Sequence, residues 1–372
     1  MFRRRGSLYR VLTAPPGAAA ERLAYAAHGV QRHYQETPPL SQPWHPWSPP
    51  EGSSERIAFC ATAAEPLADI RAWLNYARAL GVTHFYLFTE GRANLEANVA
   101  ALQREPGVTV IRNDEELARA HASSRIWSEN WLSSFFHKPC NYELFVRQSL
   151  NMEIAIRHAA RDGVDWILHI DTDELIWPGG SPHYSLAQIL AAVEPSVDVV
   201  VFPNYEAMPE RDDVQDPFLE VTLFKRNFEH VDQSVYFAHY REVAHDNGNF
   251  FLTYGNGKAA ARVQKGLRPN GAHRWQNYLK IVNEITSAQA AVLHYTYNRF
   301  SDLKARRDRC DCAPNEEDAK RCFILPFDRA AYLASSLMDD RELRQWFKQH
   351  LLWDDPAVVD TLLHSGIFAR LY

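Results

Sequence analysis

Residues 165–175 read Asp-Trp-Ile-Leu-His-Ile-Asp-Thr-Asp-Glu-Leu, so an apolar run leads directly into an acidic one. The apolar part, 166–170, predicts a short strand buried on both faces. The acidic part follows where that strand would end. In open α/β sheets, ligands bind at the carboxyl ends of the strands. The stretch therefore predicts a parallel sheet with a ligand site around Asp171 and Asp173.

The segments before this stretch alternate between strand and helix patterns. Apolar runs predict strands at 57–61, 82–88 and 108–111, whereas 67–80 repeats its apolar residues at helical spacing. Further helices are predicted at 95–102 and, ending at Asp162-Gly163, at 142–161. This βαβαβ order with short connections indicates an α/β fold with a mostly parallel central sheet covered by helices.

The chain divides into three predicted parts. Residues 1–54 contain a proline-rich run and predict a disordered or extended tail. Residues 55–312 form the α/β domain, in which a helix at 185–193 and a strand at 197–202 precede a mixed, strand-rich region that includes 220–224. Residues 313–372 predict a helical extension packed on that domain.

Composition limits the possible partners. The chain has 40 Lys and Arg against 46 Asp and Glu, a net charge of −6, which disfavours nucleic acid as a partner. No apolar run is long enough for a transmembrane segment. The basic residues near the N-terminus precede no apolar segment of the kind that a secretory signal needs.

Three of the five cysteines lie close together, as Cys310, Cys312 and Cys322. An odd total argues against a full disulfide framework. The three residues are compatible with one disulfide and a thiol, with a partial zinc site, or with unlinked thiols, and unlinked thiols are the favoured interpretation.

Asp171 and Asp173 have the spacing of a metal-binding pair. Two carboxylates on a turn after a strand can approach one Mg2+ or Mn2+ ion, with phosphate oxygens completing its shell. Such an ion neutralises the charge that builds up on a diphosphate leaving group. Asp-x-Asp arises about once by chance in a chain of this length, so a capping and turn cluster is the alternative.

Seven stretches carry a resemblance to a known family, in one order along the chain. They are 147–153 (Arg-Gln-Ser-Leu-Asn-Met-Glu), 165–175, 202–206 (Phe-Pro-Asn-Tyr-Glu), 251–258, 268–275, 291–297 and 306–310. Together they resemble the plant KOBITO-type glycosyltransferase-like proteins and, more distantly, glycosyltransferase family 92. The resemblance covers roughly residues 140–350 and is weaker over 57–110.

The resemblance implies a GT-A-type nucleotide-sugar-binding domain, a nucleotide-sugar donor and a divalent metal. Asp171 and Asp173 match the family's acidic metal motif, and His294 matches the late histidine that completes the metal shell. Imidazole is an acceptable ligand of Mn2+ and a poor ligand of Mg2+, so His294 mildly favours manganese. A buried histidine bonded to the backbone is the alternative.

Four residues are candidates for binding the nucleotide sugar. Lys258 closes Tyr-Gly-Asn-Gly-Lys, where glycines permit a close approach to a ligand and lysine meets phosphate, or where a turn merely exposes a lysine. Arg262 and His273 are lesser candidates for the same anionic pocket. Glu65 follows the first strand, where the broader family has Asn-Glu and this chain has Ala-Glu, which puts base recognition in doubt.

An inverting transfer needs a carboxylate base beside the acceptor hydroxyl. Glu206 and Asp213 follow the strand at 197–202 and are the candidates, with an acidic surface loop as the alternative for each.

The sequence thus predicts a metal-dependent glycosyltransferase that moves a hexosyl or pentosyl group, with inversion, from a UDP-sugar to a glycan acceptor. A non-catalytic relative that binds glycans or acts as a scaffold is the main alternative. A nucleotidyltransferase is a third, disfavoured because no basic glycine-rich loop follows the first strand. The family implies the secretory pathway, whereas the N-terminus shows no secretory signal, so the location stays open.

Overall fold

The computed structural model describes residues 55–129, 141–181, 183–243, 256–305, 312–323 and 325–371. The predicted tail at 1–54 and the cysteine at position 310 lie outside the described residues, and the three-part division of the chain stays a prediction.

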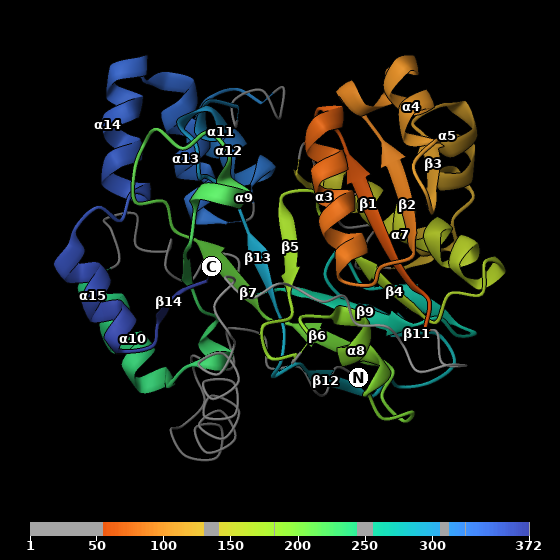
Figure 1. The fold of residues 1–372 in the computed structure, drawn as a ribbon. Coiled ribbons are helices and arrows are strands. Elements are labelled where there is room, and N and C mark those ends of the chain that lie inside the picture. The colour runs from red at the N-terminus through yellow and green to blue at the C-terminus, as the bar shows by residue number, and fades with distance from the viewer. Residues whose placement is uncertain are drawn as a thin grey trace.

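A seven-stranded sheet forms the centre of the first half of the molecule (Figure 1). Six of its strands run in one direction, and only β9 runs the other way, between β4 and β6. In spatial order the strands are β12 (Glu284–Thr286), β6 (Val199–Phe202), β9 (Lys258–Arg262), β4 (Trp166–His169), β1 (Ile57–Ala63), β2 (His84–Thr89) and β3 (Val108–Arg112).

Helices cover both faces of this sheet. Successive side chains of a strand point to opposite faces, and those of β1 divide accordingly between two hydrophobic clusters. Phe59 packs with Trp73 of α3 (Leu67–Ala79), whereas Cys60 packs in the cluster that contains Met152 of α7 (Asn141–Arg161). The sheet is therefore buried on both sides, as its apolar strands predict.

A second, five-stranded sheet lies beside the first (Figure 1). Its order is β14 (Phe368–Arg370), β8 (Leu223–Lys225), β7 (Asn204–Ala207), β13 (Ala291–His294) and β5 (Glu174–Trp177). Strand β5 begins where the acidic turn after β4 ends, so this turn links the two sheets. Strands β10 (Leu267–Pro269) and β11 (Trp275–Asn277) form a separate pair.

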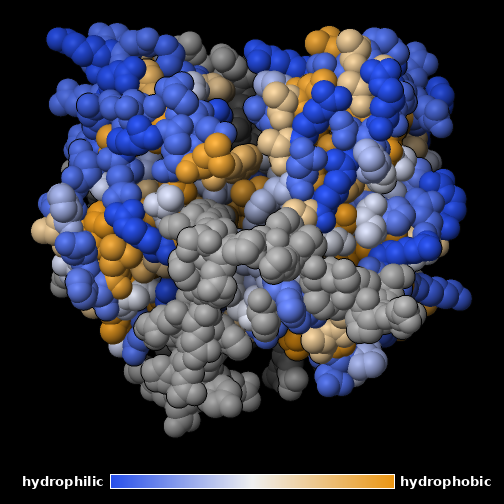
Figure 2. Space-filling view, in the orientation of Figure 1, coloured by the Kyte–Doolittle hydropathy of each residue, from blue (hydrophilic) through white to orange (hydrophobic). Residues whose placement is uncertain are grey.

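The C-terminal helices pack on the second sheet around their own apolar core, which includes Phe327, Phe347 and Leu362. In the space-filling view, the outer surfaces of α14 (Asp340–Leu351) and α5 (Glu115–Ala122) are mainly hydrophilic (Figure 2). The C-terminal helices are α11 (Phe300–Ala305), α12 (Glu316–Cys322), α13 (Pro326–Leu337), α14 (Asp340–Leu351) and α15 (Pro356–His364). The remaining helices are α4 (Glu96–Leu102), α5 (Glu115–Ala122), α8 (Leu186–Ala191), α9 (Pro217–Glu220) and α10 (Gln233–Val243).

The predicted α/β fold, with a mostly parallel central sheet and C-terminal helices, is confirmed. Its GT-A type stays a prediction. One segment differs from its prediction: the region at 220–224 does not begin as a strand. Asp216 caps α9 by accepting a hydrogen bond from the backbone of Phe218, and Pro217 occupies the first turn of the helix. Both residues favour a helix start, and the strand β8 begins only afterwards.

The cysteines also differ from the favoured interpretation. Cys312 and Cys322 are joined by a disulfide, so they are not unlinked thiols, while Cys60 is a buried thiol. Within the described ranges, no group of three or more His, Cys, Asp or Glu residues has the arrangement of a metal site. None of the helices described here is both long and apolar enough to cross a membrane.

Candidate active site

The acidic turn lies where β4 of the first sheet ends and β5 of the second begins. The backbone N–H of Asp171 donates to Oε2 of Glu174 over 2.9 Å, and the N–H of Glu174 donates to the carbonyl of Asp171 over 3.1 Å. These reciprocal bonds fix the turn. The backbone N–H of Tyr295 donates to the carbonyl of Asp173 over 3.0 Å, which attaches the turn to the end of β13.

Two side chains from distant parts of the chain hold the Asp171 carboxylate. The side-chain amide of Gln148, on α7, donates to Oδ1 over 2.7 Å, and Nζ of Lys258, at the start of β9, donates to Oδ2 over 2.6 Å. The same Nζ lies 3.2 Å from Oε2 of Glu174. Lys258 is 0% exposed, so its ammonium group is an internal counter-charge to two acids.

The two acids divide the negative charge unequally. Burial alone would raise the pKa of Asp171, but the Lys258 ammonium outweighs it and holds that pKa well below its usual range. Burial raises the pKa of Glu174 to about 7, although Lys258 opposes the change. The pKa of Lys258 is above its usual range, because the two acids outweigh its burial. Asp171 and Lys258 are thus a charged pair at neutral pH.

A row of four ionisable residues crosses the second sheet from this turn. In the strand register Glu174 lies opposite His294, His294 opposite Glu206, and Glu206 opposite Lys225. We call these four residues the charged row. Paired residues on neighbouring strands share one face of a sheet. The charged row therefore connects the acidic turn to the interior of the second half of the molecule.

His294 and Glu206 form an ion pair within the charged row. Nδ1 of His294 lies 2.8 Å from Oε2 of Glu206, and the side-chain amide of Asn204 donates to the same oxygen over 3.0 Å. Burial would lower the pKa of His294, but Glu206 outweighs it and raises the pKa to about 10. Burial lowers the pKa of Lys225 to about 8, against the opposing effect of Glu206. His294 therefore presents an imidazolium beside the turn.

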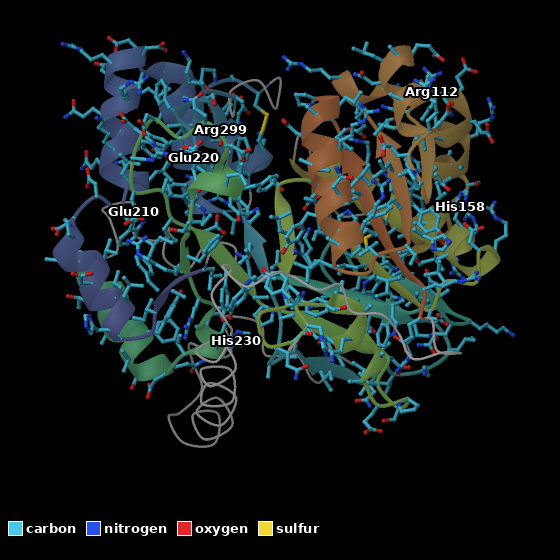
Figure 3. All side chains as sticks on the ribbon, in the orientation of Figure 1. Arg112, His158, Glu210, Glu220, His230 and Arg299 are labelled. Carbon is cyan, nitrogen blue, oxygen red and sulfur yellow. A yellow bond between two sulfur atoms is a disulfide. The ribbon has the colours of Figure 1, made fainter. Side chains whose placement is uncertain are left out.

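Other carboxylates gather near Asp173, whose own carboxylate accepts no hydrogen bond in the part of the chain that is described. Burial raises the pKa of Glu65 and of Asp302, and Asp173 adds to both increases by repulsion. Asp302 is held by Arg299, whose Nε lies 2.9 Å from its Oδ1. Arg299 belongs to the half of the molecule that carries the C-terminal helices (Figure 3). Asp173 thus lies between groups from both halves.

Helix α7 supplies three residues that the sequence reasoning gave no role. Besides Gln148, Arg147 binds Glu90 through two hydrogen bonds of 2.8 and 3.1 Å, and Asn151 donates to Oγ1 of Thr62 over 2.9 Å. Thr62 lies near the end of β1, and Glu90 follows β2. The first half of the helix therefore lies at the carboxyl ends of β1 and β2. The only signal in the sequence was that these residues fall within the family-like stretch 147–153.

The three predicted metal ligands do not form a preformed metal site. Both carboxylate oxygens of Asp171 are bonded to Gln148 and Lys258, and the imidazole of His294 is ion-paired with Glu206. A histidine that ligates a metal must be neutral, and the ion pair keeps His294 charged. Asp171, Asp173 and His294 do come together around the turn, as predicted, but their contacts do not fit a bound ion.

Of the four predicted nucleotide-binding residues, Glu65, His273 and Lys258 lie near the acidic turn, whereas Arg262 does not. Glu65 lies near the acidic turn, as expected. His273 also lies within electrostatic range of Asp171, but its Nδ1 is bonded to the carbonyl of Gly257 over 2.9 Å. Burial, aided by the charge of Lys258, lowers the pKa of His273 to about 3, so it is neutral. Lys258 itself is buried, which contradicts both a lysine in contact with phosphate and a solvated lysine.

Arg262 was placed wrongly by the sequence reasoning. It lies opposite Trp166 in the register of β9 with β4, at the amino end of β4 and thus at the far edge of the sheet from the acidic turn. Its guanidinium donates to the carbonyls of Val197 and Val193 and stacks over the ring of Trp166. Arg262 therefore stabilises the fold and does not reach the anionic pocket for which it was a candidate.

Neither predicted base has an available carboxylate beside the turn. Glu206 is 2% exposed and bonded to His294, so it positions that imidazole. Asp213 has a side chain that is 71% exposed and bonded to Arg211, in a surface loop. Glu210 and Glu220, which bracket the loop, lie in the half that carries the C-terminal helices (Figure 3). The inverting outcome, which depended on these residues, stays a prediction.

Comparisons with known proteins assign this α/β fold with its acidic turn to a class. The chain is 53% identical over 317 residues to the glycosyltransferase-like protein At3g57200 of Arabidopsis thaliana, covering 85% of this chain and 62% of that protein. It is 50% identical over 317 residues to the glycosyltransferase-like protein At2g41451 of the same plant, covering 85% of this chain and 70% of that protein. The chain therefore belongs to the family of these glycosyltransferase-like proteins.

Solved structures give weaker similarities. The mannosyltransferase PcManGT of Pyrobaculum calidifontis, solved with GDP-Man and Mn2+, matches with a TM-score of 0.32 and 13% identity over 94% of this chain and 90% of that one. The mannosyltransferase Ktr4p of S. cerevisiae, solved with GDP, matches with a TM-score of 0.27 and 10% identity over 53% of each chain. Neither similarity transfers a substrate or metal to this chain. No protein-family model matches, and the distant likeness to family 92 stays a prediction.

Proposed function

We propose that the protein transfers a sugar from a nucleotide-sugar donor, of the UDP-linked type, to a glycan acceptor. The observation that carries the proposal is the convergence of Glu65, Asp173 and His294 at the junction of the two sheets. They come from the ends of different strands, and this edge of an α/β sheet is where ligands bind. The family membership, including its narrower KOBITO-type form, supports the same reaction class.

The side chains at the turn suit both the diphosphate and the sugar hydroxyl groups of such a donor. The imidazolium of His294 lies beside the turn, where a positive charge stabilises a departing diphosphate. The carboxylates of Asp173 and Glu65 are acceptors for the hydroxyl groups of a ribose or a transferred sugar. The Mn2+ or Mg2+ ion of the sequence-based prediction has no part in this proposal, because the contacts of Asp171 and His294 do not fit a bound ion.

One observation favours a second candidate function, a non-catalytic glycan-binding or scaffolding protein. The charged groups at the turn are largely neutralised by one another, as in Asp171 with Lys258 and Glu206 with His294. A site that has lost catalysis can keep such internal pairs for stability alone. The two candidates differ in whether the protein hydrolyses a bound nucleotide sugar or transfers its sugar.

Calorimetric titration of the full chain with UDP, GDP and CDP tests the proposal. We expect UDP to bind and Asp173→Asn to weaken that binding by about tenfold or more, because a charged acceptor is lost. The matched control is Asp69→Asn, on the exposed first turn of α3, which should bind UDP as the wild type does. Hydrolysis of UDP-sugars should follow the same order, with the wild type and Asp69→Asn equally active and Asp173→Asn weaker.

Two results would overturn the proposal. One is a wild-type protein that binds neither a nucleoside diphosphate nor a UDP-sugar. The other is Asp173→Asn protein that binds UDP as tightly as the wild type, which would move the site away from the turn. Binding without hydrolysis or transfer would favour the scaffolding function.

A further inference from the structure

We infer that Lys258 is a built-in cation of the acidic turn, which takes the position that a divalent metal ion would need. This inference rests on the proposed function, since it assigns the charge balance of the same site. It goes further in stating that the turn carries no resident metal ion and that donor binding does not depend on one.

The contacts of Lys258 are those of a bound cation. Its Nζ lies 2.6 Å from Oδ2 of Asp171 and 3.2 Å from Oε2 of Glu174, so one ammonium group bridges two carboxylates. The other oxygen of Asp171 is occupied by the amide of Gln148. A divalent ion at Asp171 would therefore have to displace a hydrogen-bond donor and stand beside a fixed positive charge.

The lysine cannot readily leave this position. It begins β9 between two strands, with Phe202 of β6 as its register partner, and the side chain is 0% exposed. Gly257, directly before it, has a φ of +57°. A Cβ at Gly257 would lie 2.0 Å from the carbonyl oxygen of Phe202, so the backbone passes too close to β6 for any other residue. The close approach of Gly257 to β6 thus fixes the backbone that holds the Lys258 ammonium group beside Asp171 and Glu174.

Lys258 acts through Asp171 and Glu174 and is therefore a positioning residue. A residue that only stabilised the fold would not change the affinity of the protein for a metal ion, whereas removal of Lys258 should raise it. With the lysine in place, its ammonium group balances the charge of Asp171 and also faces Glu174, so the two acids attract Mn2+ weakly. Without it, the same two acids face each other uncompensated and become a cation site.

The experiment measures binding of Mn2+ alone, by the electron paramagnetic resonance signal of the free ion and by thermal unfolding. The full-length wild type should show no saturable binding and no change in melting temperature with MnCl2. Lys258→Met should unfold at a lower temperature, bind Mn2+ at least about tenfold more tightly than the wild type, and recover stability when Mn2+ is added. The double variant Lys258→Met/Asp171→Asn should lose both responses.

Saturable Mn2+ binding by the wild type that Asp171→Asn removes would overturn the inference, and this measurement needs no folded Lys258 variant. Equal Mn2+ affinities of the wild type and Lys258→Met would overturn it as well. The assay contains no nucleotide sugar, so failure of the proposed transferase function leaves its result unaffected. Conversely, UDP binding that requires Mn2+ would refute the inference and keep the transferase.

Discussion

The side-chain amide of Gln148 donates a hydrogen bond of 2.7 Å to Oδ1 of Asp171, across 23 residues of sequence. This contact fixes α7 against the acidic turn, on the side of Asp171 away from Lys258. A carboxylate with only one partner can rotate about the Cβ–Cγ bond. The two contacts together therefore fix the orientation of the Asp171 carboxylate.

Gln148→Leu should lower the free energy of unfolding by about 1.5–3 kcal/mol, because a hydrogen bond to a charged, partly buried acceptor is lost. Urea unfolding followed by circular dichroism measures the change. Gln349→Leu, an exposed position on α14, is the control and should change stability by less than about 0.5 kcal/mol. Equal effects of the two substitutions would contradict the importance of the contact.

Glu206 and His294 should be energetically coupled. Each single substitution, Glu206→Gln or His294→Gln, leaves one buried charge without its partner and should cost about 3–5 kcal/mol of unfolding free energy. The double substitution removes both charges, so it should cost less than the sum of the singles by about 1–3 kcal/mol. A double-mutant cycle in urea gives this difference, and strict additivity would show that the two groups do not interact.

Gly257→Ala should destabilise the protein by more than Gly163→Ala does. Both glycines have positive φ, +57° and +67°, which costs alanine about 1–3 kcal/mol. At Gly163 the nearest atom to an added Cβ is the end of the Arg56 side chain at 3.4 Å, whereas at Gly257 it is the Phe202 carbonyl at 2.0 Å. Both variants carry the strain of a positive φ, so a larger loss of melting temperature in Gly257→Ala measures the clash with the Phe202 carbonyl. Equal losses of melting temperature would refute the close approach.

His230 should make the protein sensitive to mild acid. It accepts a hydrogen bond from the hydroxyl of Tyr205 and donates one to the carbonyl of Ser287, and burial lowers its pKa to about 3. The unfolded chain takes up this proton near pH 6.5, so the stability is complete above that pH. It then falls by up to about 1.4 kcal/mol for each pH unit between 6.5 and 3.

The measurement is the slope of unfolding free energy against pH from 6.5 to 4. His230→Gln should show a shallower slope than the wild type, because the titrating group is gone while a hydrogen-bonding side chain remains. Identical slopes would mean that His230 is protonated as easily in the folded protein as in the unfolded chain.

Much of the central fold follows from local patterns in the sequence. The apolar run at 166–170 becomes β4 and the helical spacing at 67–80 becomes α3. Periodicity determines which face of a strand or helix is buried, and that information lies within a few residues of each position. The meeting of Asp171, Asp173 and His294 was predicted through the family resemblance, since nothing in the local pattern of β13 indicates its partner.

Only the tertiary structure decided the roles of Lys258 and Arg262. Both lie on β9, four residues apart, and the sequence placed both in one anionic pocket, with Arg262 as the lesser candidate. Because β9 runs antiparallel between β4 and β6, its start lies at the carboxyl end of β4 and its end at the amino end of β4. Lys258 therefore meets the acidic turn and Arg262 the opposite edge. Strand direction depends on pairing between distant segments, and local sequence does not encode it.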